Sequence, residues 1–291
     1  MAEVDCGIKA HDVHELYCHF LAERLGYYAD EGLRVRVVDV TFTPDEKLPR
    51  TRYFQVACGA AYLGRREGFP FKVVLAAATR PMFWLHARPE IETIEDLRGT
   101  RVATYPPVAP PHWFHRVLLR KHGLEPDSDL EFWPCRDDII RLGLLRGGDV
   151  DAALLSSATS PVAVQRLGFR TLALSGDEVR FVTTGVATFE SIIEEERSLV
   201  EAIVRSHRRA LRAIHEQPDE AIAVLAEQLR ESDEVACATF ELMRHCFTAD
   251  GVAEPEVLAG ALGDLGAELP LAGEVRPADL YDFSLLDPVA A

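Results

Sequence analysis

Residues 4–40 read VDCGIKAHDVHELYCHFLAERLGYYADEGLRVRVVDV, and this stretch decides the fold class of the chain. Residues 4–9 alternate between apolar and polar side chains, as a half-buried strand does. Residues 14–30 place apolar side chains three or four positions apart, which predicts an amphipathic helix that Gly32 ends. Residues 33–40 alternate again. The stretch is therefore predicted to be a strand–helix–strand unit, the repeating unit of an α/β protein with parallel strands.

The same alternation continues along the chain and predicts two lobes. The unbroken apolar run at 71–78 is typical of a buried parallel strand. Further strands are predicted at 53–56, 101–104, 130–133 and 150–155, and further helices at 59–67, 113–122 and 138–145. Beyond Glu190 the pattern becomes helical. We predict two crossings between the lobes, near 85–88 and 181–185, so that residues 1–87 and 185–291 form the first lobe and residues 88–184 the second.

The composition excludes several classes of function. The 291 residues include 31 basic and 47 acidic side chains, a formal net charge of −16. Such a chain repels phosphate backbones, so a nucleic-acid partner is not expected. The longest apolar run, residues 73–78, is far shorter than the roughly 20 residues that a membrane helix needs, so membrane insertion is not expected. The six cysteines show no metal or disulfide spacing, which favours reduced thiols.

The N-terminal sequence bears on the cellular location. It reads MAEVDCGIKAHD, which has neither the basic n-region nor the apolar h-region of an export signal. We therefore expect a cytoplasmic protein.

Several segments resemble a known family in their order and spacing. They are FLAERLGYYADEGLRV at 20–35, GFPFKVV at 68–74, IEDLRGTRVA at 94–103, GGDVDAA at 147–153 and YDFS at 281–284. They resemble the type II periplasmic-binding-protein-like family, which holds the nitrate, sulfonate and taurine binding components of ABC importers and the fungal-type thiamine-pyrimidine synthase. The resemblance implies a two-lobed α/β fold with a ligand cleft between the lobes and a helical C-terminal part.

The resemblance implies two functions of different classes. The first is a small-molecule binding protein of the ABC-importer type, which clamps a small aromatic or carboxylate ligand; an ABC permease is a partner only if the protein is exported. The alternative is a cytosolic enzyme on the same fold, such as a decarboxylase or a biosynthetic rearrangement enzyme that acts on an aromatic carboxylic acid. The synthase's run of cysteines for iron is missing from this sequence. The sequence requires no cofactor, and it leaves a divalent metal open.

Candidate site residues come from the rule that ligands of open α/β sheets bind beyond the carboxyl ends of the strands. The expected ligand-binding residues are Lys9, Cys58, Gly59, Thr79, Arg80, Trp84, Thr104, Tyr105, Trp113, Ser156, Ser157, Thr183 and Thr184. The candidates for proton transfer are His11, His86 and His112. Arg80 is the candidate for holding a carboxylate, because its guanidinium fork binds both oxygens. No residue is assigned as a metal ligand.

A proline-rich loop gives a hint about the ligand. Prolines at 106, 107, 110 and 111 have no N–H to offer an anion, so the loop offers the side chains of Tyr105, His112 and Trp113 instead. This favours a larger, flatter ligand. The alternative interpretation is that Pro111 merely starts a helix, where proline is common.

Two histidine pairs are also candidates. His11 with His14, and His112 with His115, would each lie near one helical face. Two such pairs could form a metal site or an acid/base pair, but we expect His115 to be packed or exposed instead.

Overall fold

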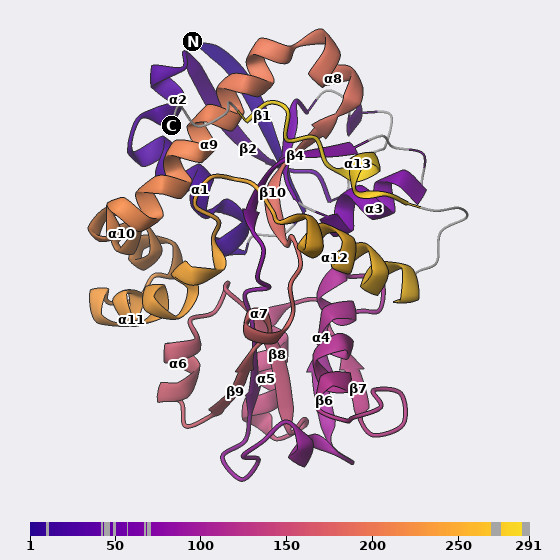
Figure 1. Ribbon diagram of the computed structural model, residues 1–291. Helices are drawn as coiled ribbons and strands as arrows, with labels where there is room; N and C mark the ends of the chain where they lie inside the picture. The colour runs from indigo at the N-terminus through magenta and orange to yellow at the C-terminus, as the bar shows by residue number, and fades with distance from the viewer. Residues whose placement is uncertain are drawn as a thin grey trace.

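The computed structural model describes residues 1–9, 12–41, 43, 47–48, 51–56, 58–66, 68, 71–268 and 275–286. In this part of the chain the strands form two five-stranded sheets, and each sheet is the centre of one lobe (Figure 1). Helices cover both sheets, and the C-terminal third is helical. The predicted two-lobed α/β architecture is confirmed.

The first sheet has the strand order β2-β1-β3-β10-β4. Its strands are β1 (Ala2–Ile8), β2 (Leu33–Asp39), β3 (Tyr53–Gln55), β4 (Phe71–Ala78) and β10 (Thr184–Phe189). β1 pairs in parallel with β2 and β3, whereas β10 is antiparallel to both β3 and β4.

The second sheet has the order β7-β6-β8-β5-β9. Its strands are β5 (Phe83–Ala87), β6 (Arg101–Thr104), β7 (Glu131–Pro134), β8 (Ala152–Ser156) and β9 (Arg170–Leu174). β6 is parallel to β7 and β8, and β5 runs antiparallel to β8 and β9. Each sheet therefore contains one antiparallel strand, and neither is the fully parallel sheet that the alternation predicts.

The helices divide between the two lobes and the C-terminal part. Around the first sheet lie α1 (Val13–Arg24), α2 (Tyr27–Asp30), α3 (Cys58–Arg66), α8 (Glu190–Glu195) and α9 (Arg197–Glu216). The second lobe contains the 3₁₀ helix η2 (Glu95–Leu97), α4 (Pro110–Lys121), α5 (Asp138–Gly147), α6 (Pro161–Arg166) and α7 (Ser175–Glu178). The C-terminal part adds α10 (Pro218–Leu229), α11 (Asp233–Met243), η3 (Arg244–Cys246), α12 (Pro255–Glu268) and α13 (Pro277–Leu280). None of the described helices is long and apolar enough to span a bilayer.

One expectation about strands is confirmed and one needs correction. β4 is buried and runs in the same direction as β1, β2 and β3, as expected, although it ends the sheet and pairs with the antiparallel β10. The first crossing was expected near 85–88, but β5 already belongs to the second sheet. The chain therefore leaves the first lobe between Ala78 and Phe83.

The core explains why the long helix α9 forms. One face of the helix is completely buried: its residues Val200, Ile203, Val204, His207, Leu211 and Ile214 are all 0% exposed. On the outer face Arg205 pairs with Glu31 and Arg209 with Asp30, so the helix is amphipathic.

Candidate ligand site between the lobes

The first lobe contributes the start of α1. Asp12 is the N-cap residue, but its side chain makes no capping hydrogen bond. Its carboxylate instead accepts a hydrogen bond of 2.5 Å from the hydroxyl of Ser156. The backbone N–H of His14 donates to Ser157 Oγ at 2.9 Å, and Nδ1 of the buried His14 ring lies 2.6 Å from the same oxygen. Both serines belong to the second lobe, so the structure is a closed form in which the two lobes touch through polar groups.

The second lobe holds Ser156 through a buried ion pair. Asp138, the first residue of α5, accepts hydrogen bonds from the N–H of Ser156 at 2.8 Å and from its hydroxyl at 2.6 Å. The other carboxylate oxygen of Asp138 contacts the guanidinium of Arg141 and lies 3.2 Å from the Tyr105 hydroxyl. Arg141 is fully buried, donates to the carbonyls of Leu154 and Cys135, and stacks 3.7 Å from the centre of the Tyr105 ring. The donors of Arg141 are therefore largely engaged within its own lobe.

The Ser156 hydroxyl lies between two carboxylates. Its oxygen is in hydrogen-bond range of both Asp12 and Asp138, yet a hydroxyl has a single hydrogen to donate. The two carboxylates therefore compete for that hydrogen. A ligand that brings its own donor to this position would satisfy both.

A group of possible metal ligands lies at the same place. The ligand atoms of Asp12, His14 and Glu15 all lie within 4.8 Å of one another. Burial, and secondarily the charge of Asp12, raises the pKa of the Glu15 carboxyl well above its ordinary value. Burial lowers the pKa of His14, so its ring is neutral at pH 7. Two carboxyls and a neutral imidazole are ligands that a divalent cation such as Zn²⁺ accepts.

Five of the expected ligand-binding residues lie at the lobe boundary. Ser156, Ser157 and Tyr105 belong to the network just described, and Thr184 lies 3.5 Å from the Glu15 carbonyl through its hydroxyl. Gly59 lies at the start of α3, where a Cβ atom would meet Pro110 of the second lobe at 2.4 Å. Ser156, Ser157, Tyr105 and Gly59 lie at or shortly after the end of a strand, as the strand-end rule expects. Thr184 lies at the start of β10, a strand that runs away from the boundary.

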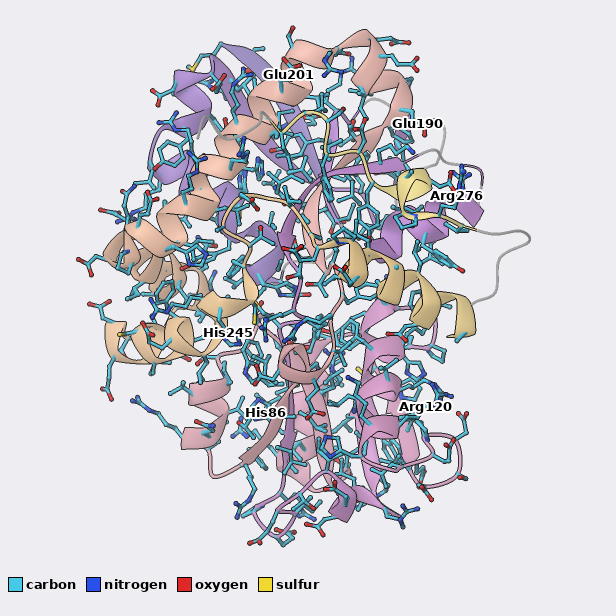
Figure 2. All side chains as sticks on the ribbon, in the orientation of Figure 1. His86, Arg120, Glu190, Glu201, His245 and Arg276 are labelled. Carbon is cyan, nitrogen blue, oxygen red and sulfur yellow. The ribbon has the colours of Figure 1, made fainter. Side chains whose placement is uncertain are left out.

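Of the proposed proton-transfer histidines, His86 lies away from this network, His112 contacts it through the Tyr105 backbone, and the third lies outside the described residues. His86 is inside β5, where it pairs with Ala153, and it lies within the lower lobe in Figure 2. It is 1% exposed, and its Nδ1 lies 3.1 Å from the Thr171 hydroxyl. His112 packs on Phe132, and its Nδ1 lies 3.1 Å from the Tyr105 carbonyl. His11 is the histidine that is not described.

The remaining candidates serve the core or the crossings. Trp84 and Trp113 are 2% and 4% exposed, inside hydrophobic clusters. The Thr104 hydroxyl bonds His115, which is packed as expected. Lys9 is exposed at the end of β1, and the side chain of Cys58 is not among those described. Thr79, Arg80 and Thr183 lie on the two crossings, where the N–H groups of both threonines are bonded to backbone carbonyls.

The proline-rich loop was misread as a ligand surface. Pro110 and Pro111 start α4, which confirms the alternative interpretation of these prolines. All three side chains that the loop was expected to offer are buried: Tyr105 under Arg141, His112 against Phe132 and Trp113 in a core cluster. The inference of a flat aromatic ligand from this loop therefore loses its basis.

Sequence reasoning named His14 only as half of a histidine pair, and it missed Asp12, Glu15, Asp138 and Arg141 as site residues. Asp12 and Glu15 lie beside His14 after the first strand and could have been included with it. Asp138 and Arg141 face each other one helical turn apart, and this i,i+3 spacing of opposite charges was the available signal. Their burial, which makes the pair important, is a tertiary property.

Known proteins share this fold. The riboflavin-binding protein RibY of Chloroflexus aurantiacus is 23% identical over 224 residues, which cover 74% of this chain and 63% of RibY, less than two thirds of its length. The alkanesulfonate-binding protein SsuA from Xanthomonas axonopodis pv. citri, bound to MOPS, superposes with a TM-score of 0.72 at 17% identity, over 97% of this chain and 98% of SsuA. The desulfurization enzyme DSZB superposes with a TM-score of 0.75 at 15% identity, over 97% of both chains.

At these identities the structural likeness shows the fold, which binding proteins and an enzyme share. A family model described as NMT1/THI5 like matches residues 15–221, well over half of the chain. The resemblance seen in the sequence is thereby confirmed, and the chain belongs to the NMT1/THI5-like family.

Proposed function

We propose that this protein is a small-molecule binding protein of the type that serves ABC importers, and that it closes its two lobes on the ligand. One observation carries the proposal: the start of α1 and the end of β8, from different lobes, meet through His14–Ser157 and Asp12–Ser156 hydrogen bonds. Contacts of this kind stabilise the closed state, and a ligand held between the same residues would add to them.

The charges at the boundary favour a ligand with hydrogen-bond donors. Asp12 and Asp138 compete for one hydroxyl hydrogen, and Glu15 lies beside Asp12. Arg141, the cation of the network, is already engaged by Asp138 and two carbonyls. An N–H, O–H or ammonium group is therefore bound here in preference to a carboxylate. RibY is named for binding riboflavin, whose ring N–H and hydroxyl groups have this chemistry.

A permease partner belongs to this proposal, since neighbours of this fold include binding components of ABC importers. It requires the protein to meet its ligand outside the cytoplasm. The cytoplasmic location stays a prediction of the sequence, and fractionation of cells that express the full chain tests it.

A thermal-shift titration tests the ligand class. The probes are riboflavin, MOPS as a sulfonate and benzoate as an aromatic carboxylate. We expect the donor-rich probe to raise the melting temperature and Asp12→Asn to weaken its binding at least tenfold. The exposed Asp219→Asn is the matched control and should bind as the wild type does. Binding of the sulfonate or benzoate alone, unchanged in Asp12→Asn, would contradict the proposal.

An enzyme is the second candidate, because DSZB catalyses a reaction on the same fold and three titratable groups meet at the boundary. In that case His14 would move a proton on a bound ligand. Mass spectrometry of a captured ligand after incubation separates the two functions. A changed ligand whose turnover is lost, but whose binding is kept, in His14→Gln would establish the enzyme.

A further inference from the structure

Two arginines, one on each crossing between the lobes, converge on a single carbonyl. Arg80 follows β4 on the first crossing, and Arg180 precedes β10 on the second. Nη1 of Arg80 donates to the Gly176 carbonyl at 3.4 Å, and Nη1 of Arg180 donates to the same oxygen. Gly176 belongs to α7, which lies at the boundary between the lobes in Figure 1. The two guanidinium groups are therefore neighbours.

Neither guanidinium has a carboxylate partner in the described part of the chain. Within the described residues no carboxylate oxygen lies within 4.0 Å of Arg80 or Arg180, whereas Arg88 and Arg101 of the same lobe both pair with Asp151. The neighbouring Asp177 is bound to His245 at 3.0 Å, and His245 is labelled at the lobe boundary in Figure 2. Both arginines are half-buried, so water compensates their mutual repulsion only in part.

The pKa of Arg180 reflects the same arrangement. Burial lowers it, the charge of Arg80 lowers it further, and Asp177 opposes the shift. In addition, the hydroxyl of the fully buried Ser175, next to Gly176, has no hydrogen-bond partner among the described residues. Among the described residues, this turn therefore combines two cations that no carboxylate binds directly with an unsatisfied hydroxyl.

We infer that Arg80 and Arg180 form a binding site for a small oxyanion, such as a carboxylate, phosphate or sulfonate group, on the hinge and apart from the Asp12–Ser156 contact. An oxyanion accepts several N–H bonds from guanidinium groups and removes their repulsion. The arginines belong to different crossings, and the lobes move relative to each other about these crossings. An anion that both arginines hold therefore links the two crossings. The site therefore couples anion binding to lobe closure.

A purely structural role makes a different prediction. If the arginines only satisfy the Gly176 carbonyl, Arg80→Gln lowers stability to the same extent with or without anion. If they bind an anion, the wild type gains stability from it and the variant does not.

Isothermal titration of the full chain at constant ionic strength decides between the two. Inorganic phosphate and succinate are the probes, and the probe that binds with higher affinity identifies the class of anion. We expect binding to the wild type and at least tenfold weaker binding to Arg80→Gln and to Arg180→Gln. Arg197→Gln, which removes an exposed pair with Glu201, should bind as the wild type does. Asp12→Asn should also keep anion binding, which separates this site from the proposed ligand site.

The proposal is overturned if neither probe binds, or if the arginine variants bind as the wild type does. Circular dichroism first establishes that each variant is folded. If Arg180→Gln fails to fold, Arg80→Gln decides alone, because Arg80 makes a single long hydrogen bond to the Gly176 carbonyl. Arg80→Lys is the second variant: it keeps the charge, loses the fork, and should show intermediate affinity.

Discussion

Among single residues, Arg141 has the largest expected effect on stability. It is 0% exposed and Asp138 is 8% exposed, so each compensates the other's buried charge. Arg141→Met leaves the Asp138 carboxylate buried without its cation, and we expect a loss of about 3–5 kcal/mol in the free energy of unfolding. Urea denaturation measures it. The double variant Asp138→Asn/Arg141→Met should lose clearly less. Equal losses in the single and double variants would show that packing on Tyr105 matters more than charge.

Ser157 is the residue whose loss should open the lobes without unfolding them. Its hydroxyl accepts the His14 N–H and contacts the ring of the same residue. Ser157→Ala leaves these buried groups without a partner in the closed form, at a cost of about 1–3 kcal/mol. We expect a larger radius of gyration by small-angle X-ray scattering and a nearly unchanged melting temperature. The exposed Ser128→Ala is the control. A radius equal to the control's would mean that other contacts hold the lobes closed.

At the scale of elements, strand direction decides which of the expected site residues lie at the lobe boundary. Ser156 ends β8, and Tyr105 follows β6, a parallel neighbour, so both lie at the boundary. His86 was expected to follow the strand at 71–78, but residues 83–87 form a further, antiparallel strand, β5. Its first residue, Phe83, pairs with Ser156, so His86 lies three residues, about 10 Å, farther from the boundary. No strand was predicted at 83–87, so the strand-end rule was applied to the strand before β5 and placed His86 in a loop at the boundary.

The contact between α3 and α4 gives a prediction about closure. A Cβ atom on Gly59 would lie 2.4 Å and 2.9 Å from two ring carbons of Pro110, and a proline ring cannot move aside alone. We expect Gly59→Ala to hold the lobes apart and to weaken ligand binding at least tenfold. Gly143→Ala in α5 has open space around the new methyl group and should instead stabilise by about 0.5–1 kcal/mol. If the lobes of Gly59→Ala close as those of the wild type do, α3 shifts enough to accommodate the new methyl group.

For the whole molecule, the alternation of strands and helices predicted the two lobes but not how they meet. Each βαβ unit is local in sequence, so its pattern is visible in about 30 residues. The Asp12–Ser156 contact joins residues 144 positions apart, and the local sequence pattern around either residue gives no sign of its partner. The same holds for Arg80 and Arg180, whose common partner Gly176 appears only when both crossings are folded. The sequence therefore predicts which loops are near the boundary, whereas the polar pairs that close it require the tertiary structure.

Buried histidines should make the whole molecule sensitive to acid. Burial is the main cause that lowers the pKa of four of them, to about 3 for His19, His86 and His115 and to about 4 for His207. At pH values between these lowered pKa values and the ordinary pKa of 6.5, the histidines are protonated in the unfolded chain but not in the folded chain. The free energy of unfolding therefore falls as the pH falls. At pH 5 each histidine contributes a loss of about 2 kcal/mol, and four such losses are comparable with the whole stability of a typical domain.

Urea denaturation between pH 7.5 and 4.5 tests this, and His86→Gln tests the cause. The variant has one fewer histidine to protonate on unfolding. Its free energy of unfolding should therefore depend on pH less steeply than that of the wild type, by up to about 1.4 kcal/mol per pH unit below pH 6. His215→Gln, which replaces an exposed histidine, should keep the wild-type slope. If His86→Gln also keeps that slope, protons reach His86 in the folded state, and the acid sensitivity must come from the other three buried histidines or from the carboxylates.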